Sequence, residues 1–181
     1  MDYKYITGHA LSLPEKTGWE DGMLLQDIYP DSSFVSGSKN PQSMRMKPVI
    51  KNNLVYAKYI FEDRFAGGPG LVHGGILSAA LDDLMGYATV IHNRMCVTAN
   101  LEVNYIIPVP VEQEYELFAW VRDIDGKKIT TESVIKSQEN THVESRGLFI
   151  DLGENAFKHF APEKNYPWSK FYLLENDSLL E

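Results

Sequence analysis

The sequence predicts an α+β fold in which a curved, mainly antiparallel sheet wraps one long central helix. Two patterns carry this prediction. Over residues 76–91 the apolar side chains recur every three to four positions, which is typical of a helix. That helix is apolar nearly all round, so it should be buried nearly all round. Several strand-like runs, separated by turn residues, supply the sheet that must enclose it.

The strands are predicted from runs that are rich in β-branched and aromatic residues. The first run opens after Asn52-Asn53, and four more follow the helix. Asp125-Gly126 lies between two alternating runs and is a strong hairpin signal. We therefore expect the last four strands to form an antiparallel meander. One strand, a long buried helix and four strands make the hotdog fold. The predicted strands cover 54–62, 96–107, 113–124, 128–138 and 142–152.

The chain of 181 residues is long enough for one domain with a substantial core. Residues 1–50 are predicted to be an irregular lead-in that packs on the domain, with a short amphipathic helix around Trp19 to Tyr29. Residues 51–153 form the hotdog domain. Residues 154–181 form an aromatic and charged C-terminal extension, which we expect to be helical and to pack back on the domain.

The composition argues against several classes of protein. A net charge of -8 disfavours nucleic acid as a partner, because phosphate binding needs basic clusters. No run approaches the ~18–20 apolar residues that span a bilayer, and the first residues lack the pattern of a secretory signal. The single cysteine, Cys96, excludes an intrachain disulfide. A reducing, cytoplasmic setting is therefore the default expectation.

The sequence also offers no recognisable site for a metal or a cofactor. The five histidines are scattered without metal-ligand spacing. The glycine-rich stretch at 67–70 fits neither the dinucleotide-binding nor the P-loop spacing, and no Gly-x-Ser-x-Gly elbow is present. We therefore expect no metal and no cofactor.

Three segments resemble the signature of hotdog-fold acyl-CoA thioesterases. They are Gly68 to Gly75 (GPGLVHGG), Ala80 to Gly86 (ALDDLMG) and Val97 to Pro110 (VTANLEVNYIIPVP). The branch that they resemble contains the phenylacetate-pathway enzymes and the mammalian thioesterase-superfamily members. The resemblance covers about residues 33–152. It implies hydrolysis of an acyl-CoA to a free acid and CoA.

The segment before the first strand also resembles this branch. Asn40-Pro41 and Arg45-Met46 match a motif that is often seen there. That motif commonly carries two cysteines, where this chain has Ser33 and Ser36. The departure leaves open what these two positions do, and it does not touch the residues expected at the site.

The glycines at the start of the helix suit a thioester substrate. A thioester carbonyl gains negative charge on oxygen when it is attacked, so a site must direct hydrogen-bond donors there. Backbone N–H groups at a helix N-terminus are such donors, and Gly74 and Gly75 have no side chain to block an approaching carbonyl. The resemblance implies that Gly74 is the oxyanion donor. On local grounds, the glycines could also serve only tight packing.

The expected catalytic carboxylate is Asp82, nine residues after His73, which is the family's spacing. An aspartate in an apolar helix is costly unless something stabilises it. Asp82 would act as a general base on water or as a nucleophile; the other interpretation is a structural ion pair or a helix-to-loop hydrogen bond. Asp83 lies about 100° further round the helix and is interpreted as structural.

Four further residues complete the predicted site. Thr98 matches a family hydroxyl that positions water or the carboxylate, although threonine is common in strands anyway. His73 either holds the glycine loop, which we favour, or touches the substrate. Arg45 and Lys47 form a modest basic cluster with Lys51. That cluster is either a solvated surface or a patch for the phosphates of CoA.

Helix geometry predicts that the site is shared between two subunits. Gly74 and Asp82 are eight residues apart, about 12 Å along a helix, whereas the carbonyl atoms that they must reach lie about 1.2 Å apart. In a two-fold dimer, Gly74 of one chain can meet Asp82 and Thr98 of its partner. We therefore expect a homodimer with shared active sites, and a dimer of dimers remains open.

Two other functions remain open at this stage. A non-catalytic hotdog module would bind an acyl-CoA without hydrolysing it. An acyl-thioester dehydratase or hydratase would use a histidine together with a helix carboxylate. His73 is followed by two glycines and lacks the preceding acidic residue expected of the hydratase type.

Overall fold

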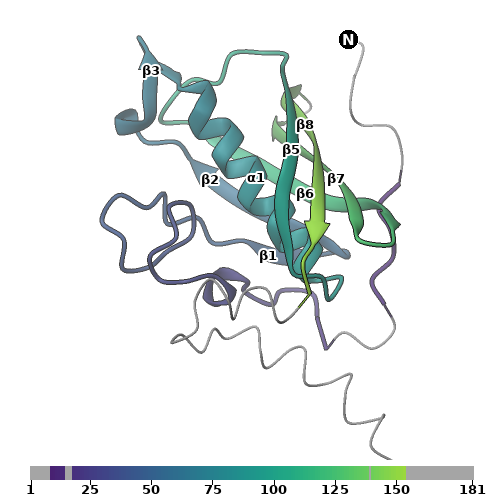
Figure 1. The fold of residues 1–181 in the computed structure, drawn as a ribbon. Helices are drawn as coiled ribbons and strands as arrows, with labels where there is room; N and C mark the ends of the chain where they lie inside the picture. Colours follow the sequence, from purple (N-terminus) through teal and green to yellow (C-terminus); the bar gives the residue numbers. More distant parts are fainter. Residues whose placement is uncertain (1–8, 15–17, 139, 154–181) are drawn as a thin grey trace, which may run out of the picture.

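A computed structural model describes residues 9–14, 18–138 and 140–153 (Figure 1). The C-terminal extension predicted over 154–181 lies outside these ranges. One long helix, α1, runs across the concave face of a sheet, which confirms the predicted α+β hotdog fold. No helix in the described part of the chain is long and apolar enough to cross a membrane.

The sheet has six strands in the order β1-β2-β6-β7-β8-β5, and all neighbouring pairs are antiparallel. All five predicted strands begin within two residues of their predicted starts. The strands are β1 (Val49–Lys51), β2 (Leu54–Ile60), β5 (Cys96–Tyr105), β6 (Glu114–Asp125), β7 (Lys128–Ser137) and β8 (Asn140–Asp151). Between β6 and β7, Gly126 has a φ of 57°, as the predicted hairpin requires.

The predicted four-strand meander is wrong for its first strand. Strands β6, β7 and β8 do form a meander, but β5 pairs with β8 at the far edge and not with β6. Since β5 and β6 are not neighbours, the connection between them crosses the sheet. Along this connection, the Val109 carbonyl accepts a 2.9 Å hydrogen bond from the N–H of Val72. Pro108 and Pro110 therefore mark a loop that passes the start of α1 and not a hairpin.

The lead-in differs from the prediction at two places. The helix expected around Trp19 to Tyr29 is replaced by a single turn of 3-10 helix, η1 (Gln26–Ile28). Gly22 has a φ of 85°, which a continuous helix does not allow, and Leu24 forms a β-bridge with Val49. Strand β1 was missed because it has three residues. It is joined to β2 by Asn52 and Asn53, whose φ values of 52° and 63° suit a two-residue hairpin turn.

The predicted glycine loop contains a short ladder. A turn of 3-10 helix, η2 (Asp63–Phe65), leads into β3 (Ala66–Gly68), which pairs with β4 (Leu71–Val72). Gly70 lies between them with a φ of 70°, a conformation that favours glycine. The ladder ends directly before α1 (Gly74–Val90), so it fixes where the helix begins.

Helix α1 is buried more completely in its second half than in its first. Every residue from Leu84 to Val90 is buried, whereas Ser78 and Asp82 on the first turns are half-buried and Gly75 is exposed. Leu81 and Leu84 are fully buried, and each contributes roughly 1.5–3 kcal/mol relative to an exposed leucine. The first half of the helix thus keeps one open side, which holds the predicted site residues.

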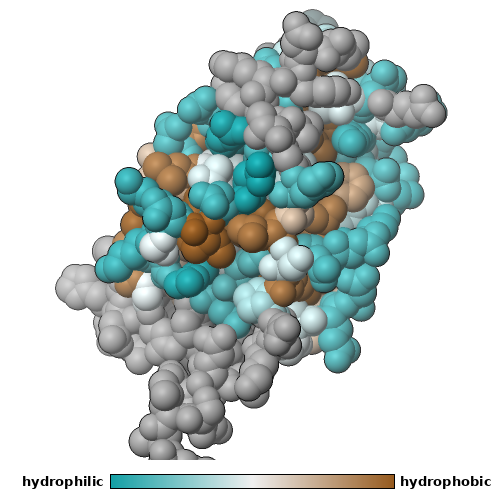
Figure 2. Space-filling view, turned by 90° about the vertical axis from the view of Figure 1, so that its right-hand side faces the viewer, coloured by the Kyte–Doolittle hydropathy of each residue, from teal (hydrophilic) through white to brown (hydrophobic). Residues whose placement is uncertain are grey.

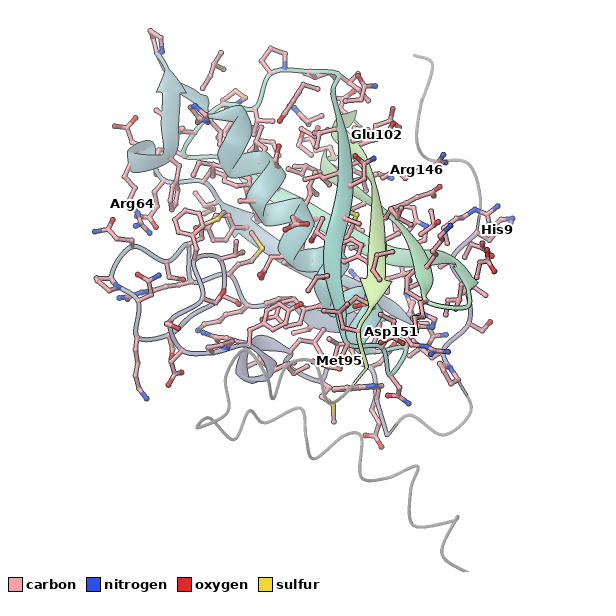
Figure 3. All side chains as sticks on the ribbon, viewed as in Figure 1. His9, Arg64, Met95, Glu102, Arg146 and Asp151 are labelled. Carbon is pink, nitrogen blue, oxygen red and sulfur yellow. The ribbon has the colours of Figure 1, made fainter. Side chains whose placement is uncertain are left out.

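The outer face of the sheet is mixed in character. Figure 2 shows the side of the molecule that lies to the right in Figure 1, where hydrophobic residues form a band among hydrophilic ones. On the outer face, Glu102 of β5 lies opposite Arg146 of β8 (Figure 3). Arg146 also forms an ion pair with Glu132 of β7 at 3.2 Å. Polar cross-strand contacts are therefore part of the outer face of the sheet.

Candidate active site

The first turn of α1 is capped by His73. The Gly75 N–H donates a 2.9 Å hydrogen bond to Nδ1 of His73, whose backbone is extended. This is the loop-holding contact that the sequence favoured for His73. Within the described ranges, the Gly74 N–H has no hydrogen-bond acceptor. Of the two glycine amides, only that of Gly74 is therefore open to a substrate.

Tyr105, at the end of β5, reaches the same turn of the helix. Its hydroxyl donates a 3.0 Å hydrogen bond to the carbonyl oxygen of Gly74, and Ser78 donates a 3.1 Å hydrogen bond to that oxygen as well. The hydroxyls of Tyr105 and Ser78 are 2.6 Å apart. Our sequence reasoning did not identify either residue. Ser78 lies four positions after Gly74, a spacing at which a serine can bond back to the helix carbonyl.

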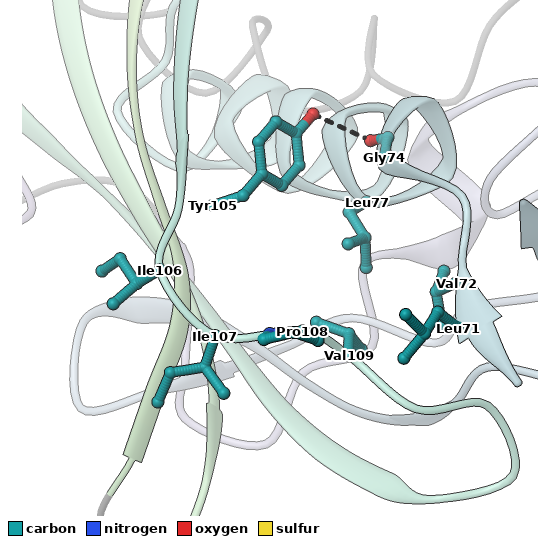
Figure 4. A pocket seen from close by; sticks show the side chains of 9 residues that line it. All are labelled: Leu71, Val72, Gly74, Leu77, Tyr105, Ile106, Ile107, Pro108 and Val109. Carbon is teal, nitrogen blue, oxygen red and sulfur yellow. Dashed lines mark hydrogen bonds between the residues drawn. The ribbon is translucent and has the colours of Figure 1, made fainter. Parts of the chain in front are cut away.

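An apolar pocket of about 270 Å³ opens beside Gly74 (Figure 4). It has no charged residue in its lining. Figure 4 shows Tyr105 between this space and the helix, with its hydroxyl directed toward Gly74. An uncharged group could therefore lie against the open Gly74 amide. The lining residues are Leu71, Val72, Gly74, Leu77, Tyr105, Ile106, Ile107, Pro108 and Val109.

Two turns further along the helix, Asp82 pairs with Thr98. The Thr98 hydroxyl donates a 2.8 Å hydrogen bond to Oδ1 of Asp82. The structure thus brings together two residues that the sequence placed in one site. Among the residues the structure describes, no ion pair involves Asp82.

A β-bulge turns Thr98 toward the helix. Leu101 lies opposite Gly147 and Thr98 lies opposite Phe149, so β5 uses one residue more than β8 between these pairs. Side chains alternate faces along a regular strand, and without the extra residue at Ala99 the side chains of Thr98 and Leu101 would point to opposite faces. The bulge restores both to the inner face. It is therefore the reason that the threonine hydroxyl meets Asp82.

The environment of Asp82 favours a carboxyl that holds its proton more firmly than usual. Burial raises the pKa of Asp82, and the hydrogen bond from Thr98 partly opposes this by stabilising the charged form. A carboxylate whose pKa is raised in this way is a better proton acceptor than one in water. The site therefore offers a half-buried base or nucleophile with a hydroxyl to orient it.

Asp83 faces away from this pair, and its half-buried side chain lies against the N-terminal segment, which we define as residues 18–48. Burial raises the pKa of Asp83 to about 7, the charge of Asp82 adds to the rise, and the Ser36 hydroxyl opposes it. Its Oδ2 atom is buried, and the described residues provide no hydrogen-bond partner for it. A protonated Asp83 suits this environment at neutral pH.

The two serines that stand where the family often has cysteines connect the N-terminal segment to α1. Ser36 is fully buried, donates to Ser33 at 3.2 Å and accepts a 2.8 Å hydrogen bond from Tyr87 on the helix. The Tyr87 ring also packs on Tyr29, with centroids 4.2 Å apart. In this chain, the two positions thus hold the N-terminal segment against the second half of the helix.

Arg45 and Lys47 are not brought to these groups. Both are exposed and alternate along the chain with the buried Met44 and Met46. In the described part of the chain, no hydrogen bond or ion pair joins either side chain to the candidate site. Their predicted contact with CoA phosphates stays a prediction.

Two half-sites therefore lie on one face of each chain. The first has the open Gly74 amide with Tyr105 and the apolar pocket, and the second has Asp82 with Thr98. The helix separates them by about 12 Å. No group of histidine, cysteine or carboxylate side chains that could hold a metal ion occurs within residues 9–14, 18–138 and 140–153. The chemistry that this arrangement allows is attack on a carbonyl whose oxygen is held by a backbone amide.

Comparisons with known proteins identify distant relatives of this chain. Residues 69–144 match the thioesterase superfamily. The acyl-coenzyme A thioesterase THEM4 of Rattus norvegicus is 30% identical over 143 residues, which are 70% of this chain and 62% of that protein. The chain spans 36% to 62% of the length of the THEM4 relatives from four vertebrates.

Solved structures share the fold. A crystal structure of a thioesterase superfamily protein superposes with a TM-score of 0.64 at 28% identity, and the match covers 67% of this chain and 61% of that one. A Streptococcus mutans protein crystallised with acetyl CoA has a TM-score of 0.57 at 14% identity, over 60% of this chain and 90% of that one. The chain therefore has the hotdog fold, residues 69–144 of it match the thioesterase superfamily, and it is distantly homologous to the THEM4 acyl-coenzyme A thioesterases, as the sequence resemblance predicted.

Proposed function

We propose that this protein is an acyl-CoA thioesterase that hydrolyses its substrate to a free acid and CoA. One observation carries the proposal: Asp82 is a half-buried carboxylate held by the Thr98 hydroxyl at 2.8 Å, and no cation of the described residues pairs with it. A half-buried carboxylate that no ion pair neutralises remains available as a base or a nucleophile. The similarity of this chain to the THEM4 thioesterases also supports the proposed thioesterase activity.

In the proposed mechanism, the Gly74 N–H donates to the thioester oxygen and stabilises the negative charge that develops there. Asp82 either removes a proton from an attacking water and passes it to the departing sulfur, or attacks the carbonyl carbon to form a mixed anhydride that a water molecule then hydrolyses. In both cases the products are the free acid and the CoA thiol, whose proton comes from the water. Thr98 orients the carboxylate. The apolar pocket beside Gly74 would receive an uncharged part of the substrate, and Gly75 lines the approach. Arg45 and Lys47 would contact CoA phosphates.

The proposal includes a homodimer, because Gly74 and Asp82 of one chain cannot reach the same carbonyl. Strand β5 supports this part. It lies at the sheet edge, no described strand pairs with its outer side, and Val97 to Asn100 are exposed. Exposed strand edges are usually covered in natural proteins. A second copy paired along β5 would bring the open sides of the two helices together. A dimer of dimers and a cytoplasmic location stay parts of the proposal.

The test is turnover of acyl-CoA esters of graded chain length, followed by released thiol. We expect hydrolysis by the wild type and a loss of at least about a thousandfold in kcat for Asp82→Asn, because the essential base or nucleophile is removed. The matched control is Asp123→Asn, an exposed aspartate on β6, which should keep full activity. Full activity of Asp82→Asn would refute the proposed role.

The same panel separates the two rival functions. A hydratase would change enoyl absorbance without releasing thiol. A non-catalytic module would bind acyl-CoA without hydrolysis, and Asp82→Ala would bind equally well. His73 is less suited to the hydratase chemistry, because its ring caps the helix.

A further inference from the structure

The Gly74-Gly75 peptide is held from both sides by side chains. On the carbonyl side, the hydroxyls of Tyr105 and Ser78 contact the Gly74 oxygen at 3.0 and 3.1 Å. On the amide side, the Gly75 N–H donates to Nδ1 of His73 at 2.9 Å. Three side chains from the preceding loop, the helix and strand β5 thus fix one peptide plane.

This peptide needs such support because two consecutive glycines have unusual conformational freedom. Glycine loses more backbone entropy on folding than any other residue and weakens a helix by about 0.5–1 kcal/mol relative to alanine. The first turn of a helix also lacks the hydrogen bonds of its interior. Without the contacts, the direction of the adjacent Gly74 N–H would vary, and an oxyanion donor is effective only when it is preorganised.

We infer that Tyr105, together with Ser78, is a positioning residue that fixes the Gly74-Gly75 peptide and thereby directs the open Gly74 N–H at the thioester oxygen. The catalytic part of this inference rests on the proposed function. Tyr105 can take this role because it points inward from β5, opposite the buried Val143. Its hydroxyl would lie 3.3 Å from a Cβ atom at Gly74, so the ring stands directly beside the glycine.

The first arm of the test measures the clamp without any substrate. In Tyr105→Phe/Ser78→Ala, we expect the Gly75 amide to exchange with solvent at least about tenfold faster than in the wild type, because the peptide is freed on its carbonyl side. Tyr59→Phe is the matched control, since the Tyr59 hydroxyl also donates to a backbone carbonyl, that of Met44, at 2.6 Å. Unchanged exchange in the double variant would overturn the clamp.

The second arm measures catalysis by released thiol. We expect Tyr105→Phe to lower kcat about tenfold and to leave KM within about twofold. The reason is that a misdirected Gly74 N–H stabilises the transition state less but does not weaken substrate binding. Ser78→Ala should show a smaller loss of the same kind, and Tyr59→Phe should show none. A raised KM with unchanged kcat would mean that Tyr105 binds substrate instead, and an unchanged kcat would also overturn the inference.

The two proposals fail in different ways. If Asp82→Asn keeps its activity while Tyr105→Phe/Ser78→Ala frees the Gly75 amide, the proposed function is wrong and the structural clamp stands. If Asp82→Asn is inactive while Tyr105→Phe is fully active, the function stands and the positioning role of Tyr105 is refuted. Melting temperatures within a few degrees of the wild type would show that a loss of kcat is not a loss of folded protein.

Discussion

Thr98 on β5 donates a hydrogen bond to Asp82 on α1 across 2.8 Å, and sixteen residues separate the two in the chain. This bond lowers the pKa of a carboxyl that burial raises. In Thr98→Val the pKa of Asp82 should therefore rise further, and the acid limb of kcat/KM should move to higher pH. A hydrogen bond to a charged group contributes about 1.5–3 kcal/mol, so we expect a loss of roughly tenfold or more on the acid limb and little loss on the plateau.

Steady-state kinetics from pH 5 to 9 would check this shift. Thr98→Ser keeps the hydroxyl and should retain the wild-type profile. A uniform loss across the whole pH range in Thr98→Val would contradict the explanation through the Asp82 pKa.

The Gly74 amide can be removed without a change in helix start. Proline lacks the N–H and is favoured at the first position of a helix, and His73 before it already has the extended backbone that proline requires. We expect Gly74→Pro to lose about 10²–10³ in kcat, the usual effect of removing one oxyanion donor. Gly74→Ala is the control. It keeps the N–H but adds a Cβ atom beside Tyr105, so its loss should be smaller.

Mixing Gly74→Pro with Asp82→Asn tests the shared site. In a shared-site dimer, half of the molecules in an equal mixture are heterodimers and each has one intact site, so about a quarter of wild-type activity should return. Subunits are unfolded together and refolded to allow exchange, with each variant refolded alone as the baseline. Two inactive parents that never give an active mixture would exclude the shared site.

Burial of Asp83 makes stability depend on pH. Its pKa is raised from the ordinary 3.8 to about 7, so the native state holds the proton between these values while the unfolded state releases it. Stability should therefore fall as pH rises from about 4 to about 7, by up to about 4 kcal/mol from this group. Asp83→Asn mimics the protonated form and should gain stability relative to the wild type at pH 8 but not at pH 4.

Urea unfolding at the two pH values measures the difference. The exposed Asp123 on β6 provides the comparison, because Asp123→Asn should not change the pH dependence. An equal effect of Asp83→Asn at pH 4 and pH 8 would show that the buried acid is not the cause.

Position 86 requires glycine, because the hydroxyl of Tyr29 occupies the space that a side chain would need. A Cβ atom at Gly86 would clash with that hydroxyl, whereas the next nearest atom, Cζ of Tyr29, lies at an ordinary 3.5 Å. Gly86→Ala should therefore destabilise by roughly 1–3 kcal/mol, as overpacked sites do. In a Tyr29→Phe background the penalty should vanish, because the clashing oxygen is gone and alanine favours the helix by about 0.5–1 kcal/mol. A double-mutant cycle by urea unfolding gives the coupling; equal penalties in both backgrounds would contradict the clash.

The periodic parts of the fold could be predicted from the sequence, since hydrophobic spacing reports which side of an element is buried. The helix, the strand β2 and the hairpin at Gly126 follow from local patterns. The position of β5 could not be predicted in this way, because hydrogen-bond partners depend on how the sheet closes around α1. The three-residue β1 has too few residues to show a period, and Gly22 ended the helix expected near it.

The candidate site shows the same limit at the level of single side chains. The resemblance supplied Asp82, Gly74 and Thr98, but strand alternation alone would place Thr98 on the face opposite Leu101, and only the bulge at Ala99 changes this. Tyr105 was missed because its partner, Gly74, is thirty-one residues away in the chain. Contacts of this kind depend on tertiary packing and leave no local pattern.

The cap formed by His73 also fixes the tautomer of its imidazole ring. A backbone N–H can only donate, so Nδ1 of His73 must accept from Gly75 through its lone pair. In the neutral ring the hydrogen atom then resides on Nε2, which leaves that nitrogen a donor with no basic electron pair to offer. In this tautomer the imidazole Nε2 can give a hydrogen bond but cannot remove a proton from water, so the proposed mechanism assigns no base role to His73.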